Sequence, residues 1–321
     1  MNELFLNNYV IVYLFSEAVL FLIALYAFFK DISILRFWDF NNFSSKQLKL
    51  EKQSYLLSTI ATFIFTLKLT LLIYFVYMID SLSIIIPGAM CGAGVISANS
   101  YGMSLLFVKL ITIFTFLLFL TLNNLDLKAK NYPLLKFKSW VLLAGLLLIF
   151  LETYLDIAYL FNIDLSVPVS CCSALFGNLE GANPLPFGLD IKMLLILYYT
   201  LFVSIILSLL LDNKLLTAVT LILFAVISYY AVVYFFGTYI YELPTHKCPF
   251  CMMQKEYYYI GYFVWGTLFS ALFFGLIWVI IGLLKYESKV LKRITVTSLV
   301  LFVSLCSAYV LYYYFKNGVF L

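Results

Sequence analysis

Eight long apolar runs dominate this chain of 321 residues and limit what it can fold into. Each run is long enough to cross the hydrocarbon core of a bilayer, about 30 Å thick, as a helix. Inside lipid every backbone N–H and C=O needs a partner, which only helices and closed barrels supply. The sequence therefore predicts an all-α polytopic membrane protein with about eight transmembrane helices. The runs lie at approximately 8–29, 54–79, 104–123, 139–161, 191–211, 215–237, 258–284 and 297–315.

Composition leaves little room for a soluble domain. The chain is 64% hydrophobic and 11% charged, whereas soluble domains are about 25% charged. We therefore interpret residues 1–321 as a single transmembrane domain in contact with membrane lipid. The chain has one histidine, which argues against bis-histidine haem and histidine-rich metal centres. No phosphate-binding glycine loop or nucleic-acid footprint is present, so we expect no nucleic-acid partner.

Basic residues distinguish the two sides of the predicted membrane domain. The connections after the first, third, fifth and seventh runs carry fourteen of them, whereas the opposite side has only Lys247, Lys255 and Lys316. Basic loops stay in the cytoplasm, so we expect both termini outside, in a cell inner (cytoplasmic) membrane with periplasmic loops. The fourteen are Lys30, Arg36, Lys46, Lys49, Lys52, Lys128, Lys130, Lys136, Lys138, Lys214, Lys285, Lys289, Lys292 and Arg293.

The cysteines follow this topology. Cys306 lies inside the last run, where a small buried hydrophobic residue is its simplest interpretation. The other five fall in the three predicted outer loops, which face an oxidising space where disulfides persist. An odd number leaves at least one thiol outside any internal bridge, which suits a mixed disulfide or a metal site. The outer cysteines are Cys91, Cys171, Cys172, Cys248 and Cys251.

The three outer loops share a spacing. Pro-x-x-x-Cys ends at Cys91, at Cys172 and at Cys248, and an acidic residue precedes each proline. We therefore propose three helix–loop–helix repeats, at about 54–123, 139–211 and 215–284, and we expect their cysteines to meet. Adjacent cysteines rarely bridge each other because that disulfide is strained. A bond from Cys91 to Cys171 or Cys172 is one possible second redox couple, and inert structural bridging is the alternative.

Five charged residues fall well inside the apolar runs, away from their ends, where charges are costly and usually paired or functional. At about 1.5 Å per helical residue, three of them lie roughly 13–17 Å from the outer side and two lie roughly 7 Å from it. The deeper three are Glu17, Lys68 and Glu152, and the shallower two are Lys109 and Asp156. We expect two charge layers, which join the first, second and fourth helices and the third and fourth helices. Buried ion pairs are one interpretation, and a proton route or quinone pocket is the other.

The segment 241–257 holds the only Cys-x-x-Cys pair and the only histidine. Two thiols at this spacing can close a disulfide or hold a soft metal. Lys247 and Lys255, and His246 if it is protonated, would favour a thiolate as nearby cations. We therefore expect a thiol site at the outer membrane surface.

The run Cys248-Pro-Phe-Cys251-Met-Met-Gln254-Lys255, which directly precedes a predicted helix, resembles the site of the bacterial disulfide-generating membrane oxidoreductases. The resemblance implies that Cys248 and Cys251 form a quinone-coupled pair. It also implies that Gln254 and Lys255 are quinone-binding, with Lys255 standing where that family has an arginine. The loop that begins at Cys91 is faintly similar to the outer loop of vitamin K epoxide reductase proteins.

Three functions remain open at this stage. The first is a thiol–disulfide oxidoreductase that exchanges electrons between outer cysteines and membrane quinone, with an outer-face thiol protein as its partner. Its resolving cysteine would be Cys251, and Cys91 with Cys171 or Cys172 would relay to the substrate. The second is a Cu(I) or soft-metal handling protein, because cysteine and methionine ligands select Cu(I). The third is a non-catalytic subunit of a respiratory or assembly complex.

Overall fold

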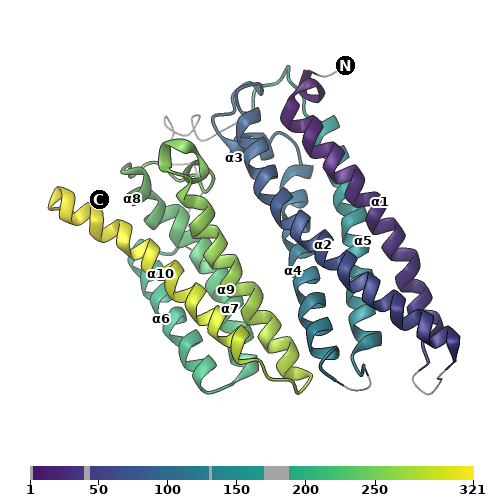
Figure 1. The fold of residues 1–321 in the computed structure, drawn as a ribbon. Helices are drawn as coiled ribbons and strands as arrows, with labels where there is room; N and C mark the ends of the chain where they lie inside the picture. The colour runs from purple at the N-terminus through teal and green to yellow at the C-terminus, as the bar shows by residue number, and fades with distance from the viewer. Residues whose placement is uncertain (1–2, 40–43, 130–131, 170–187) are drawn as a thin grey trace. The chain divides into compact units, whose positions relative to one another are not determined.

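The computed structural model describes residues 3–39, 44–129, 132–169 and 188–321. Within these ranges the chain is helical without strands, and eight helices are long and apolar enough to cross a membrane (Figure 1). The prediction of a polytopic all-α membrane protein is confirmed. The spanning helices are α1 (Asn8–Phe37), α2 (Ser45–Leu82), α4 (Tyr101–Asp126), α5 (Leu135–Phe161), α6 (Ile191–Leu210), α7 to α8 (Lys214–Tyr241), α9 (Ile260–Leu283) and α10 (Lys289–Asn317).

Short polar residues set the helix starts. The Asn7 side chain accepts a hydrogen bond from the Tyr9 N–H at 2.9 Å at the start of α1. Asn213 caps α7 through the N–H of Leu216 at 3.1 Å. These side chains satisfy amides that have no partner inside the helix. An asparagine therefore marks where each of these two helices begins.

Contacts divide the chain into two compact units. Unit 1 comprises Met1–Pro87 and Val95–Val169, and it contains α1, α2, α4 and α5. Unit 2 comprises Gly88–Gly94 and Ser170–Leu321, and it contains α6 to α10. The short helix α3 (Gly92–Ile96) lies at the division. The hairpin expected at 139–211 contributes one helix to each unit, and the threefold repeat stays a prediction.

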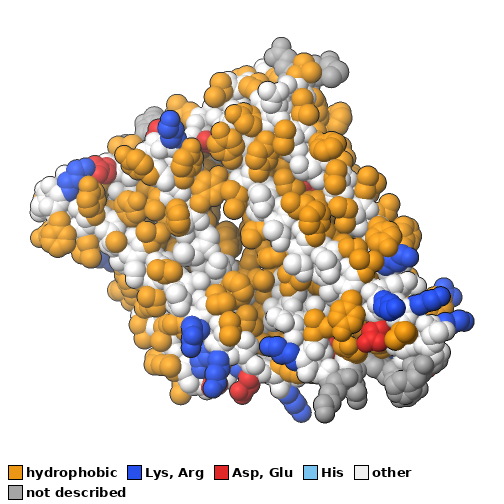
Figure 2. Space-filling view, in the orientation of Figure 1, with side chains coloured by type: hydrophobic (Ala, Val, Ile, Leu, Met, Phe, Trp, Pro, Cys, Tyr) orange, Lys and Arg blue, Asp and Glu red, His pale blue; other side chains and the backbone are white. Residues whose placement is uncertain are grey.

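The outward faces of the helices are apolar, as lipid contact requires. Along α1, Phe15, Leu22 and Phe29 recur every seven residues and are 70%, 64% and 63% exposed. In water such a stripe would be costly, whereas lipid solvates it. Figure 2 shows hydrophobic side chains over most of the visible surface. The composition of these faces supports a helix bundle that lipid surrounds.

The inward faces of unit 1 meet in a buried charge network. Lys68 on α2 donates to Glu17 on α1 at 2.5 Å and to Glu152 on α5 at 3.0 Å. Lys109 on α4 donates to Glu152 at 2.8 Å and to Asp156 at 3.1 Å. None of these five side chains is more than 3% exposed. Both charge layers expected from the sequence are confirmed, and Lys109 joins them into one network through Glu152.

Tyr13 completes this network from α1. Its hydroxyl donates to Asp156 at 2.8 Å and accepts from Lys109. The ammonium of Lys109 also lies 4.7 Å from the centre of the Phe75 ring. The network thus links all four spanning helices of unit 1, and each donor must find its acceptor because water is excluded. Charge pairing therefore fixes the helix register that apolar packing alone would leave open.

Replacing Lys109 by Met should lower the free energy of unfolding by about 3 kcal/mol, because Glu152 and Asp156 would lose a buried donor. Unfolding of the detergent-purified protein, followed by circular dichroism, measures this. Lys128 is exposed on the same polypeptide, so Lys128→Met is the matched control and should change stability by less than about 0.5 kcal/mol. Equal effects of the two substitutions would contradict the pairing argument.

Candidate thiol site

Cys91 and the distant pair of Cys248 and Cys251 form one buried cluster in unit 2. The sulfur atoms of Cys91, Cys248 and Cys251 all lie within 4.8 Å of one another. The side chains are 0%, 1% and 6% exposed. Cys91 and Cys248 approach to 3.5 Å between sulfurs, which is contact distance, since a disulfide bond measures about 2.05 Å. Of the five loop cysteines expected to meet, these three do so in the structure.

The Cys-x-x-Cys loop is held by aromatic side chains from the flanking helices. The hydroxyl of Tyr241, the last residue of α8 (Gly237–Tyr241), donates to the carbonyl oxygen of Cys248 and accepts the N–H of Met252 at 3.0 Å. The indole N–H of Trp265 on α9 donates to the carbonyl of Pro249 at 3.1 Å. These bonds satisfy backbone groups that the tight loop cannot pair internally. They hold the loop backbone through one residue that precedes the loop and one that follows it.

Local helical turns place the second cysteine. Cys251 begins the short 3₁₀ helix η5 (Cys251–Met253), and its carbonyl accepts the N–H of Gln254 at 3.0 Å. Before the loop, α7 (Lys214–Ala231) passes through a π-helical turn, η4 (Val232–Phe236), into α8. A π turn adds a residue to the helix and rotates the side chains beyond it. The chain thus enters the loop with Tyr241 directed at the backbone of Cys248.

The expected cationic surroundings are corrected in one respect. Burial lowers the pKa of His246, and the neighbouring Cys91 acts more weakly in the opposite direction. The imidazole is therefore neutral at pH 7, and its ring packs 4.2 Å from that of Tyr241, centre to centre. The ammonium of Lys247 lies 4.9 Å from the centre of the Tyr234 ring. His246 therefore provides a neutral base beside the thiols, and it does not act as a cation.

Gln254 and Lys255 are the remaining expected site residues that lie in the described part of the chain. Gln254 is half-buried and Lys255 is exposed at the start of η6 (Lys255–Tyr257). Cys171 and Cys172 lie outside the described residues. Cys306 is buried within α10. Its place in the last spanning helix is confirmed.

Sequence reasoning assigned no role to Tyr241 or Trp265. Neither belongs to the cysteine spacing, and aromatic residues near helix ends are common in membrane proteins. The only available signal was that each carries a polar atom which must find a partner when buried. Trp265 lies fourteen positions beyond Cys251, so no local pattern links the two.

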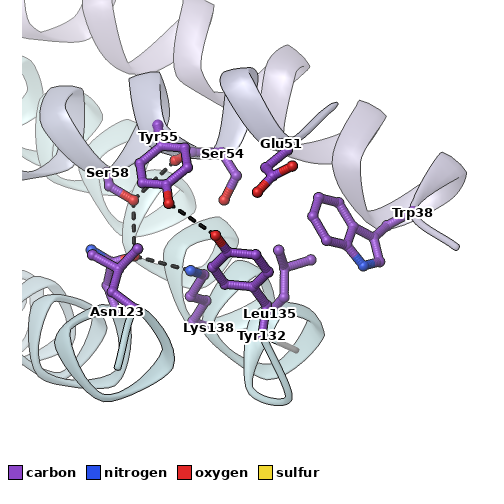
Figure 3. Close-up of a pocket in the computed structure, with 10 residues that line it drawn as sticks. Trp38, Glu51, Ser54, Tyr55, Ser58, Asn123, Tyr132, Leu135 and Lys138 are labelled. Atoms are coloured by element: carbon purple, nitrogen blue, oxygen red, sulfur yellow. Dashed lines mark hydrogen bonds between the residues drawn. The ribbon is translucent and has the colours of Figure 1, made fainter. Parts of the chain in front are cut away.

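Unit 1 holds a separate polar pocket near the connections α1–α2 and α4–α5 (Figure 3). Lys138 and Ser58 both donate to Oδ1 of Asn123, at 3.0 and 2.9 Å. The Tyr55 and Tyr132 hydroxyls lie 2.9 Å apart. Lys138 also pairs with Asp126 at 2.7 Å. Side chains of the pocket bond mainly to one another, which is typical of a structural polar cluster.

Comparison of the chain with family models, with curated proteins and with solved structures found no match. The geometry of the residues therefore carries the functional argument.

Gly261, near the start of α9, should not tolerate a side chain. A Cβ there would lie 2.6 Å from Cγ of Met252 and 2.9 Å from its backbone carbonyl carbon. We expect Gly261→Ala to displace the loop and to raise the alkylation rate of Cys248 and Cys251 in native membranes at least tenfold, because their burial depends on this approach. Timed mass-tagging measures the rate.

Gly266 is the matched control for this substitution. It lies in the same helix, and a Cβ there meets nothing within 4 Å. Gly266→Ala should leave the alkylation rate unchanged and favour the helix by about 1 kcal/mol. Indistinguishable alkylation rates for the two variants would contradict the packing argument.

Proposed function

We propose that this protein is a membrane thiol–disulfide oxidoreductase that exchanges electrons between outer-face cysteines and membrane quinone. One observation carries the proposal, the buried cluster of Cys91, Cys248 and Cys251 with 3.5 Å between the first two sulfurs. Thiol–disulfide exchange needs a thiolate in contact with a disulfide sulfur. The cluster places three sulfurs within 4.8 Å of one another, and those of Cys91 and Cys248 are in contact.

The exchange balances within these side chains. In the form with a Cys248–Cys251 disulfide, the Cys91 thiolate attacks Sγ of Cys248. The bond between Cys248 and Cys251 breaks, Cys251 leaves as a thiolate, and a Cys91–Cys248 disulfide forms. A further thiol, from Cys171, Cys172 or an outer-face protein, attacks Cys91 and returns Cys248 as a thiolate. The net result is a reduced Cys248/Cys251 pair and a disulfide between Cys91 and the further thiol.

Proton transfer has a candidate acceptor. His246 is neutral at pH 7 because burial lowers its pKa, and it lies near Cys91. A neutral imidazole accepts the proton that a thiol loses when it becomes a nucleophile. In this proposal His246 activates Cys91 as a base.

The residues next to the dithiol fit a quinone. Lys255 is exposed and follows Gln254, whose N–H bonds to the carbonyl of Cys251. An ammonium and an amide are suitable donors to quinone carbonyls. When bound, a quinone supplies an acceptor for two electrons and two protons. Lys255 and Gln254 would hold and orient it.

A second candidate function is Cu(I) handling, and the three-sulfur cluster favours it. Three thiolates within 4.8 Å of one another can ligate one soft ion. Met252, also buried, follows Cys251 directly. Copper loading is read as bound metal and quinone-driven oxidation as lost thiols, so both functions can be tested on one preparation.

The first test counts thiols by mass-tagging after anaerobic purification, before and after an oxidised water-soluble quinone is added. We expect two thiols to be lost in the wild type. Cys248→Ser should abolish this loss, because Cys248 takes part in both the Cys248–Cys251 and the Cys91–Cys248 disulfides of the proposed exchange. Membrane insertion should be unchanged.

Cys306→Ser is the matched control, because Cys306 is buried in the last helix away from the Cys-x-x-Cys loop. It should lose two thiols as the wild type does. An unchanged thiol count in the wild type, or a normal loss in Cys248→Ser, would overturn the oxidoreductase proposal.

The copper alternative makes its own prediction. Anaerobic Cu(I) addition would give about one ion per chain by elemental analysis, and Cys91→Ser would lower its affinity at least tenfold because one of three ligands is gone. Thiols that respond to quinone in a metal-free sample contradict this alternative. A sample that binds no metal and whose thiols do not respond to quinone would point to a non-catalytic subunit.

A further inference from the structure

The charge network of unit 1 is not electrically balanced. Glu17, Glu152 and Asp156 supply three carboxylates, whereas Lys68 and Lys109 supply two ammonium groups. With every group ionised the network therefore has a net charge of −1. An uncompensated charge in the apolar interior is costly, and protonation is the usual relief.

Two carboxylate oxygens of the network accept no hydrogen bond. They are Oε1 of Glu17 and Oε2 of Glu152, and both are buried. Glu17 Oε1 has only an ion-pair contact with Lys109, at 4.0 Å. One oxygen from each of the three acids lies within 4.8 Å of the other two. A proton on one acid would therefore face a neighbouring carboxylate at close range.

We propose that Glu17, Glu152 and Asp156 form a proton-binding site in the membrane interior that holds one proton at neutral pH. The bound proton brings the net charge of the network to zero. It gives one of these two oxygens an O–H, which can donate to a neighbouring carboxylate. The titration belongs to the three acids together, because they interact strongly. This inference does not rest on the proposed thiol chemistry.

A proton fits this site better than a metal cation. Lys68 and Lys109 already donate to all three carboxylates, so a metal ion would meet two positive charges. A proton needs no displacement of either ammonium. The titratable groups that face the site are Tyr13 and Glu17 from α1, Lys68 from α2, Lys109 from α4, and Glu152, Asp156 and Tyr159 from α5.

A second buried acidic group must be separated from this one in any measurement. Asp31 on α1 is 1% exposed, and Lys138, its charged neighbour, also pairs with Asp126. Asp31 lies fourteen residues beyond Glu17, about 21 Å along the helix. Apolar residues that include Leu20, Ala24 and Ile64 lie in the core between the two levels. The two sites can therefore be examined independently by substitution.

The test is infrared spectroscopy of the full-length protein in lipid nanodiscs, in H₂O and in D₂O, at pH 7. The wild type should show the stretching band of a protonated carboxyl from the network. Glu17→Gln, Glu152→Gln and Asp156→Asn should each remove one carboxyl equivalent of this band, because two carboxylates then balance two lysines. Lys68→Met should instead add one equivalent, since three carboxylates would face one lysine.

Asp164→Asn is the control, because Asp164 is an exposed carboxylate outside the network. It should leave the band unchanged. Loss of the band in only one of the three acidic variants would overturn the shared-proton proposal, and so would a wild type without the band. A band that disappears when Na⁺ or Mg²⁺ is added would show metal binding and would also overturn it.

Folding of the variants is checked by circular dichroism and gel filtration. If all three acidic variants fail to fold, the Asp31→Asn protein provides the measurement. This substitution removes Asp31 as a source of the carboxyl band, so that a remaining buried carboxyl band is assigned to the network. The carboxyl band must persist in Asp31→Asn at pH 7. Its absence there would overturn the proposal.

Discussion

Burial of ionised side chains in a medium without water is the constraint on which unit 1 depends. Each buried ammonium must meet carboxylates at hydrogen-bond distance, because the apolar interior offers no other partner. Lys68 does so across α1 and α5, and Lys109 does so from α4. The four helices can rotate or slide only at the cost of these bonds. A single network therefore sets their register and also carries the charge imbalance.

In unit 2 the main constraint is the order of the Cys-x-x-Cys loop. A loop that carries two cysteines must stay ordered at the end of apolar helices, and short backbone turns hold only part of it. Tyr241 and Trp265 supply polar tips on apolar rings, so they bind the loop backbone while their bodies remain in the core. Burial of Cys248 and Cys251 limits their access to oxidants, and contact with Cys91 provides a specific partner.

The two units place different chemistry in one chain. Unit 1 gathers carboxylates and lysines, and unit 2 gathers sulfur. Dithiol oxidation releases protons, and quinone reduction consumes them, so a proton-binding site would suit a membrane oxidoreductase. The proton site and the thiol site nevertheless rest on separate observations. Either can be correct without the other.

Local sequence determined a great deal here. Apolar length predicted eight spanning helices, because lipid demands internal backbone pairing. Helical rise alone placed Lys68 level with Glu17 and Glu152, because depth along a straight helix is a linear count. Tertiary structure alone decided that Lys109 joins the two charge layers, that Cys91 meets Cys248, and that Tyr241 holds the thiol loop. These depend on which helix faces pack together, and rotation about a helix axis is fixed by contacts between segments far apart in the chain.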